Sequence, residues 1–475
     1  MPFSTTRPFN QPSLRAWLAS AALLMAGLSS NVTQAQQVAA ASLPRTAPTP
    51  SKADTPDFWQ RHTLLEDWGG LRPWLAEKGI SFTLNQTSDY VGNTQGGIQQ
   101  GFGYDGLLDL EIEADLNQLI GWQGASFHVS GYGIQGADLS ISKTGSIMTA
   151  TSVEAQPSVS KLGEVWINQK LFDDTLDLRA GQIEADRYFV IAPSATVFVN
   201  STFGFPDPWE ASLPGGGPAY PNPVMGGLLI YNPNPTWTLQ AAVMNGNPTG
   251  RVLSSNQYGT SFPVGQGTMS WLEAAYNRQR DDENNTLAGV YKFGGWYNTE
   301  RIDNVTLTNT GRPLSNPVNM QYQGLYSVYG LIDQALWRAA NSETEGVNGF
   351  FRLTYSPQLN RNLVNWYFDT GLTYTGLFDR RPQDVIALGF AWANISPYLN
   401  TAIATQNLTT GSSIPKATFE SVIEATYQAP ISPWLTLQPF FQYAINPGGK
   451  APMPNNPNQA IPSAVVVGLR ANVSF

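Results

Sequence analysis

Six polar and aromatic residues share one face of a predicted hairpin over residues 162–182. They are Glu164, Trp166, Asn168, Lys170, Asp177 and Arg179. Asp173-Asp174 suits a two-residue turn. In a hairpin with this turn the residue numbers of each facing pair have the same sum, so Asn168 lies opposite Arg179. Alternate residues of a strand point to the same side. The hairpin therefore brings an indole, carboxylates and cations onto one surface.

A surface of this kind can recognise a sugar. A pyranose offers an apolar face to the indole of Trp166 and hydroxyls to Arg179 and Glu164, whose charged groups make strong hydrogen bonds. The alternative is structural, because the same ionic groups could form a network that stiffens the protein. The spacing of the residues is compatible with both interpretations.

A row of carboxylates indicates whether the polar face of such a strand contacts water or membrane hydrocarbon. Between Leu108 and Leu116, apolar residues alternate with Asp109, Glu111, Glu113 and Asp115. An unpaired charge inside hydrocarbon costs several kcal/mol. The acids, Glu111 among them, are therefore expected to line water, while the apolar residues face outward. This pattern favours the wall of a barrel with a wet, charged interior.

The stretch 462–475 shows the same alternation. Counting back from Phe475, every second residue to Val465 is apolar, whereas Arg470 lies on the opposite, mostly polar face. A last strand ending on an aromatic residue resembles the closing strand of bacterial outer-membrane β-barrels, where this signature is read by the assembly machinery. We therefore expect Phe475 to act as an assembly signal. The alternative is the last strand of a soluble sandwich, such as an exported adhesin or lectin.

Candidate strands recur from residue 80 to the end of the chain. About sixteen are expected, an even number within the range of outer-membrane barrels. They begin near residues 80, 106, 124, 162, 175, 224, 236, 267, 286, 320, 346, 363, 384, 417, 434 and 463. Short turns alternate with long loops, although the register between residues 320 and 365 is ambiguous. The predicted fold is all-β, a transmembrane antiparallel β-barrel with a short N-terminal helix and long extracellular loops.

The N-terminal part is predicted to contain three segments before the barrel over residues 80–475. Residues 1–35 have the basic start, apolar run and small-residue end of a secretory signal peptide. Residues 36–56 are rich in Ala and Pro and are expected to be a flexible linker. Within residues 57–79, Trp68, Leu71, Trp74 and Leu75 recur at helical spacing and predict a short amphipathic helix. From Ile80 onward, only strands and loops are expected.

Composition excludes several classes of function. The chain has 475 residues, no Cys, two His and a formal net charge of −9, which becomes −11 without the two Arg of the predicted signal peptide. Thiolate chemistry is impossible, no cofactor or metal is expected, and the acidic balance argues against nucleic acid as a partner. A hydrolase would need His128 with Ser126 or Ser130 as its nucleophile, an arrangement that serine-rich barrel walls show without catalysis.

Several blocks together resemble the carbohydrate-selective outer-membrane porins of the OprB type. They are LLEDWGGLRPWLAEKGI (64–80), GWQGASF (121–127), EVWINQ (164–169), LRAGQIEADRYF (178–189), GLFDRRPQD (376–384) and QPFFQYAINPGG (438–449). In the last block, Phe440 stands where the family often has an acid. The resemblance implies a sixteen-stranded barrel with an inward-folded loop, in the outer membrane of a Gram-negative bacterium.

The resemblance also implies a function and a set of contact residues. Family members pass monosaccharides such as glucose by passive diffusion and contact them through Arg, acidic and aromatic side chains at a constriction. This description falls on Glu164, Trp166 and Arg179, with Arg352 and Arg470 as further lumen candidates. Expected partners are sugars or other small neutral solutes, outer-membrane lipid and the barrel-assembly machinery. A non-selective or anion porin remains the main alternative, and a monomer and a homotrimer are both compatible with the sequence.

Overall fold

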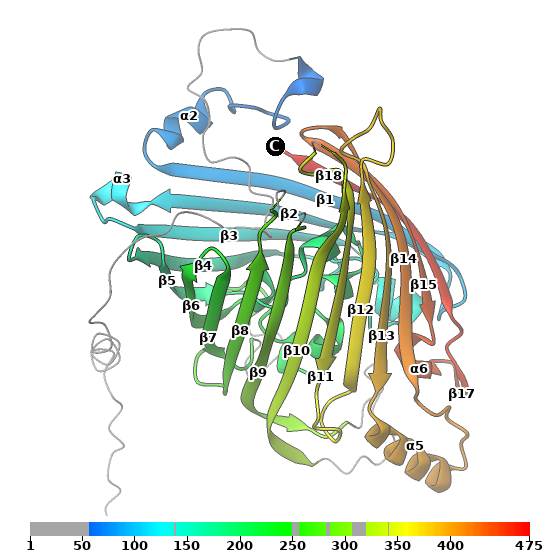
Figure 1. The fold of residues 1–475 in the computed structure, drawn as a ribbon. Helices are drawn as coiled ribbons and strands as arrows, with labels where there is room; N and C mark the ends of the chain where they lie inside the picture. Colours follow the sequence, from blue (N-terminus) through cyan, green and yellow to red (C-terminus); the bar gives the residue numbers. More distant parts are fainter. Residues whose placement is uncertain (1–56, 137–138, 249–255, 282–285, 306–319, 341) are drawn as a thin grey trace, which may run out of the picture.

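Sixteen strands of the described chain close into one antiparallel barrel (Figure 1). The computed structural model describes residues 57–136, 139–248, 256–281, 286–305, 320–340 and 342–475, so the predicted signal peptide and linker lie outside the described residues. The barrel strands are β1 (Ile80–Gln95), β2 (Gly101–Asp115), β3 (Ala125–Gly136), β4 (Ser160–Leu171), β5 (Leu176–Ile183), β6 (Val224–Asn234), β7 (Trp237–Asn245), β8 (Thr268–Arg278), β9 (Gly289–Asp303), β10 (Gln321–Arg338), β11 (Gly346–Tyr355), β12 (Val364–Thr375), β13 (Val385–Ile395), β14 (Phe419–Ser432), β15 (Leu435–Ile445) and β18 (Ala464–Ser474).

The last strand closes the barrel, as the alternation at the C-terminus predicts. Strand β18 pairs with β15 on one side and with β1 on the other, with Asp89 opposite Arg470. Strand alternation then places Arg470 inside and Leu469 outside, where it is half exposed. Closure removes both sheet edges, so each of the sixteen barrel strands has two neighbours.

The hairpin of β4 and β5 has the predicted register. Leu171 faces Leu176 and Asn168 faces Arg179, as a two-residue turn at Asp173-Asp174 requires. Asp173 and Asp174 have positive φ, 54° and 63°, which Asp tolerates better than most residues and which a type I′ turn needs, and Phe172 before them also has positive φ, 55°. Local turn chemistry therefore sets which side chains reach the lumen here.

The ambiguous stretch between residues 320 and 365 has a simple structure. Strand β10 is eighteen residues long and ends at Arg338, so the connection to β11 covers residues 339–345. The next connection, residues 356–363, joins β11 to β12 on the opposite side of the barrel. Strand alternation continues across both links: Tyr367 and Asp369 are buried inside, whereas Leu372 is about half exposed outside.

Helices interrupt the chain at places where only strands and loops were expected. The longest is α5 (Pro397–Thr410), in which the Ser396 side chain accepts the Tyr398 N–H, Pro397 occupies the first turn, and Gly411 ends the helix with positive φ. These capping signals were overlooked because the segment is rich in Thr and lacks an apolar stripe. The alternation predicted through Leu116 also fails, because Asp115 caps α3 (Leu116–Ile120) and ends β2.

The remaining helical segments are short. The N-terminal region contains η1 (Phe58–Gln60) and α2 (Leu71–Ala76), shorter than predicted because Gly69 and Gly70 adopt positive φ before it. The connections contain η2 (Ser140–Thr144), η3 (Ala185–Arg187), η4 (Pro193–Val197), η5 (Ser201–Phe203), α4 (Asp207–Glu210), η6 (Pro214–Gly216) and α6 (Pro447–Lys450), and β16 (Pro452–Met453) pairs with β17 (Asn456–Ala460). Among the described residues, no helix has the length and apolarity to cross a membrane.

Candidate functional site

Two connections fold inward and pack against the inside of the barrel (Figure 1). They are residues 139–159, between β3 and β4, and residues 184–223, between β5 and β6. Phe203 packs with Phe350 of β11, and Trp209 donates its indole N–H to Ser327 of β10 at 3.0 Å. Buried apolar contacts thus join the loops to the wall on several sides, including Trp166 of the β4–β5 hairpin, and the loops narrow the lumen.

Carboxylates of the wall hold the backbone of these loops. Glu424 of β14 accepts the N–H groups of Val199 and Asn200 at 2.7 and 2.8 Å. Asp333 of β10 accepts both the N–H and the hydroxyl of Ser194, at 2.6 and 2.7 Å. Charged acceptors make strong hydrogen bonds to backbone donors, and each bond here joins residues far apart in sequence. The inward loops are therefore fixed at several points around the barrel.

Arg352 anchors the longer loop from the wall. Its guanidinium makes a bidentate pair with Asp369, at 2.9 and 2.5 Å, and donates to the backbone oxygens of Val190, Thr202, Phe203 and Gly204. Both charged side chains are fully buried. Arg352 does point into the barrel as expected, but with no exposed surface it cannot reach a solute in this conformation.

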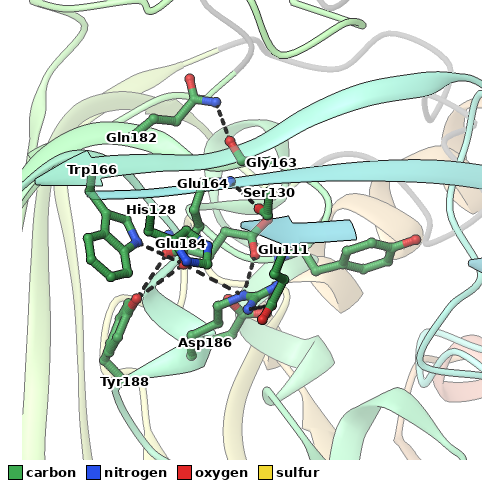
Figure 2. A network of polar contacts seen from close by, with 12 residues as sticks. Glu111, His128, Ser130, Gly163, Glu164, Trp166, Gln182, Glu184, Asp186 and Tyr188 are labelled. Carbon is green, nitrogen blue, oxygen red and sulfur yellow. Dashed lines mark hydrogen bonds and ion pairs between the residues drawn. The ribbon is translucent and has the colours of Figure 1, made fainter. Parts of the chain in front are cut away.

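A second cationic centre, Arg187, remains partly exposed and was missed by the sequence analysis. Its guanidinium lies 2.6 Å from Glu111 and 3.1 Å from Glu184, and more distantly near Asp109 and Glu164, at 3.8 and 3.9 Å. The exposed fractions of the Arg187 and Glu111 side chains are 28% and 27%. Figure 2 shows three of these carboxylates close together: Glu111 of β2, Glu164 of β4 and Glu184 at the start of the inward loop. The predicted residue Glu111 therefore belongs to a water-accessible ionic cluster.

Glu184 and Tyr132 form the buried side of this cluster. The Tyr132 hydroxyl donates to Glu184 at 2.7 Å and accepts from Arg187 at 3.1 Å. Burial, with a smaller contribution from the charge of Asp186, raises the pKa of Glu184 to about 8. Burial thus favours the protonated form of this carboxyl, which lowers the negative charge that Arg187 must balance.

Trp166 is stacked between two side chains from neighbouring strands. The His128 ring of β3 lies parallel to the indole with centroids 4.6 Å apart, and the guanidinium carbon of Arg179 on β5 lies 3.9 Å from the indole centroid. Only 6% of Trp166 is exposed. The indole thus orients Arg179 through a cation–π contact, and a sugar has no free indole face to stack on in this conformation.

Glu164 organises the residues around the indole. Its carboxylate accepts the Trp166 indole N–H at 3.2 Å, the Glu184 N–H at 2.9 Å and the Tyr188 hydroxyl (Figure 2). Only 1% of Glu164 is exposed. Glu164 therefore positions its neighbours. Tyr188 is only partly buried, and the centroid of its ring lies 4.9 Å from the guanidinium carbon of Arg179.

The remaining predicted residues lie at separate places. Asn168 is buried and donates to Asp177 at 3.3 Å. Arg470 pairs with Asp89 at 2.7 Å and donates to Ser152 of the shorter inward loop, so it is placed as a second anchor. Phe475 donates its N–H to Leu84 at 2.9 Å, and its role in assembly stays a prediction.

The missed residues lie in the block EADRYF (184–189), which directly follows β5; they are Glu184, Arg187 and Tyr188. The sequence signal was a dense run of charged and aromatic residues at the start of a long loop. The resemblance implied an inward-folded loop, but only the structure shows that this loop is one of those that turn inward.

Comparison with known proteins decides the family. A model of the carbohydrate-selective porin, OprB family, matches residues 99–475. The chain belongs to this family. It is also 26% identical to Porin B of Pseudomonas aeruginosa over 433 residues, which cover 87% of this chain and 91% of that protein.

Solved structures of an OprB porin share the fold. The high-pH structure of Pseudomonas putida OprB superposes with a TM-score of 0.78 at 25% identity and covers 88% of this chain and 100% of that one. The low-pH structure of the same protein gives a TM-score of 0.54 at 20% identity, over 88% of this chain and 99% of that one.

The OprB-family protein described here is therefore a porin of the bacterial outer membrane, a channel rather than an enzyme. The surroundings of His128 and Ser130, the residues considered for a hydrolase, agree with this assignment. His128 stacks on Trp166, and the Ser130 hydroxyl accepts the N–H of Glu164 at 2.8 Å. Within the described part of the chain, no hydrogen bond joins His128 to Ser130.

Proposed function

We propose that this porin passes monosaccharides such as glucose by passive diffusion. The observation that carries the proposal is the partly exposed cluster of Arg187 and Glu111 on a lumen that two loops narrow. Sugar hydroxyls both donate and accept hydrogen bonds, so they can exchange with the contacts of a cation and a carboxylate one at a time. An anion would have to pass the surrounding carboxylates, whereas a neutral sugar is indifferent to their long-range field.

The proposal gives the predicted residues two kinds of role. Arg187 and Arg179 donate to passing hydroxyls, Glu111 accepts from them, and the partly buried ring of Tyr188 lies beside them. Glu164 and Trp166 are positioning residues, because their side chains are buried and hold Tyr188 and Arg179 in place. The Asn168 side chain is also buried, and it contacts Asp177. Arg352 and Arg470 keep the loops inside the barrel.

Liposome swelling tests the proposal. Vesicles that contain the purified porin are placed in iso-osmotic glucose, other monosaccharides, mannitol or a gluconate salt, with no ATP present and, for the neutral solutes, no ion gradient. We expect glucose to enter faster than mannitol, which has nearly the same size, and much faster than gluconate. Rates that follow molecular size alone would instead support a non-selective porin, and a requirement for ATP or an ion gradient would exclude passive diffusion.

A further inference from the structure

An apolar groove lies outside the barrel, beneath the segment that precedes β1. It measures about 400 Å³, within the size range of small-molecule sites. Its roof is formed by Trp68, Leu71 and Leu75, and its floor by residues of β1 and β2 that include Phe82, Leu84 and Leu110. Leu110 precedes Glu111, which reaches Arg187 in the lumen, so strand alternation turns Leu110 outward. The floor is therefore part of the wall that contacts membrane hydrocarbon.

The roof is attached to the barrel at its edges. Arg72 donates to the backbone oxygen of Phe82 at 3.0 Å and to that of Phe475, and its guanidinium lies 4.6 Å from the Phe82 ring. The Leu64 N–H donates to Ser474 at 2.8 Å. These bonds fix the segment above the groove without filling it. The hollow is therefore part of the fold at this end of the barrel.

Water is a poor occupant of this groove. Its lining residues are all apolar, and water is retained only where two or more polar partners hold it. An empty apolar space is also unfavourable, because the lining atoms lose dispersion contacts. Hydrocarbon surrounds the outer wall at this level, so an acyl chain can enter from the membrane without crossing water.

Two hydrogen-bond donors beside the groove have no partner among the described residues. They are the indole N–H of Trp68, which belongs to the roof, and Nε–H of Arg72; both nitrogens are buried. Buried donors normally find acceptors. Neither nitrogen is exposed on the groove surface, so a molecule in the groove meets only the apolar lining.

The position along the barrel selects the leaflet. The groove lies at the end of the barrel where β1 begins, where the chain ends and where the short turns are. In outer-membrane barrels the short turns are on the periplasmic side. Leu71 and Trp74 are 42% and 54% exposed on the same segment, and Lys78 lies 5.0 Å from the Trp74 ring. Amphipathic segments of this kind lie in the membrane interface.

We infer that the groove beneath residues 64–79 binds one phospholipid of the periplasmic leaflet, with an acyl chain between Leu75 and Leu84. The site lies on the outer wall and is independent of the solute path. It would fasten the N-terminal segment to the membrane and to the first and last strands together.

Photolabelling tests this site in the full-length porin. The protein is reconstituted in vesicles of phosphatidylethanolamine containing a small fraction with a diazirine on one acyl chain, and labelled peptides are mapped by mass spectrometry. We expect labelling of peptides that contain Trp68, Phe82 or Leu110 to exceed labelling of the outward face of β12 and β13 at least fivefold. Equal labelling around the barrel would mean ordinary annular lipid and would overturn the inference.

Two variants sharpen the test. Leu84→Trp fills the groove and should lower labelling there at least fivefold, whereas the control Leu388→Trp, at a 57% exposed outward position of β13, should leave it unchanged. Heat-modifiable gel mobility verifies folding, and glucose-driven swelling should be unaltered in both. Groove labelling that persists in the Leu84→Trp variant would contradict the site. A crosslink between two barrels at these peptides would assign the groove to a second copy instead.

Discussion

Two arginines in the lumen meet carboxylates under opposite conditions. Arg352 and Asp369 have no exposed surface, and the remaining donors of Arg352 are used on backbone oxygens of the inward loop. Arg187 and Glu111 are more than a quarter exposed, and Arg187 is surrounded by more carboxylates than it can pair with closely. The same residue types thus serve as an anchor in one place and as an exchangeable contact in the other.

Burial accounts for the difference. A buried ion pair stays intact because leaving either charge unpaired in a low dielectric is very unfavourable. Its groups therefore do not exchange their hydrogen bonds for bonds to a solute. A partly exposed pair exchanges readily with water, and therefore also with hydroxyl groups. The inward loop creates both environments, because it covers Arg352 while it contributes Arg187.

Loss of the buried anchor should have the largest effect. Arg352→Ala leaves Asp369 buried without a partner and removes the donors from the loop backbone, and we expect a loss of about 3–5 kcal/mol in the free energy of unfolding. Denaturant unfolding followed by gel mobility measures it, with Arg380→Ala in the exposed turn after β12 as the control. The double variant Arg352→Met/Asp369→Leu should lose less than the single one; an equal or greater loss would contradict the comparison.

Loss of the exposed cation should change selectivity more than stability. Arg187→Ala removes the positive charge from a group of carboxylates, so cation over anion permeability should rise, and sugar block of the ion current should weaken about tenfold or more. Reversal potentials and single-channel recording measure the two effects. Arg187→Lys keeps the charge but loses the planar fork, so it should retain ion selectivity while sugar block still weakens. Unchanged selectivity in the Ala variant would refute the assignment.

Substitution of Arg179 tests whether this residue contacts the solute or supports the structure. Truncating a charge-assisted hydrogen bond removes roughly 1.5–3 kcal/mol, about tenfold to over a hundredfold in affinity. Arg179→Ala should therefore weaken glucose-dependent block while melting is nearly unchanged, and Lys170→Ala, on the same hairpin face but paired with Asp174, serves as the control. A lower melting temperature with unaltered block would assign Arg179 to a structural network.

The buried part of the inward loop should also make the free energy of unfolding depend on pH, with a smaller effect than the substitutions above. Burial raises the pKa of Asp207 to about 7, although Ser201 and the Thr149 N–H donate to its carboxylate. Between an ordinary pKa near 4 and about 7, the folded protein holds a proton that the unfolded chain has released, so the free energy of unfolding falls as pH rises. The slope from one such group is at most about 1.4 kcal/mol per pH unit.

Asp207→Asn removes this titration while it keeps an oxygen acceptor for the Thr149 N–H. Its free energy of unfolding should therefore vary less between pH 4 and 7 than that of the parent protein, measured by denaturant unfolding at each pH. Parallel pH profiles for the two proteins would show that Asp207 does not titrate in this range.

Much of the barrel follows from local patterns in the sequence. Alternation with period two separates Leu110 from Glu111 and Leu469 from Arg470, and the Asp173-Asp174 turn sets the register that pairs Asn168 with Arg179. These features depend on neighbours within a few residues or across one hairpin, so the strand number, the closing strand and the lumen face of the hairpin were predictable. Helix α5 was equally local, but its capping residues were overlooked.

The tertiary structure alone decided which lumen residues remain accessible. Strand alternation places Arg352 inside the barrel, but only the docking of residues 190–204 covers it completely. Arg187 belongs to a loop whose inward fold depends on wall contacts such as those of Asp333 and Glu424. Those contacts join residues more than a hundred positions apart and lack a sequence period, so no pattern along the chain encodes them. Burial is a property of the assembled barrel, and burial separates the anchor from the candidate solute contact.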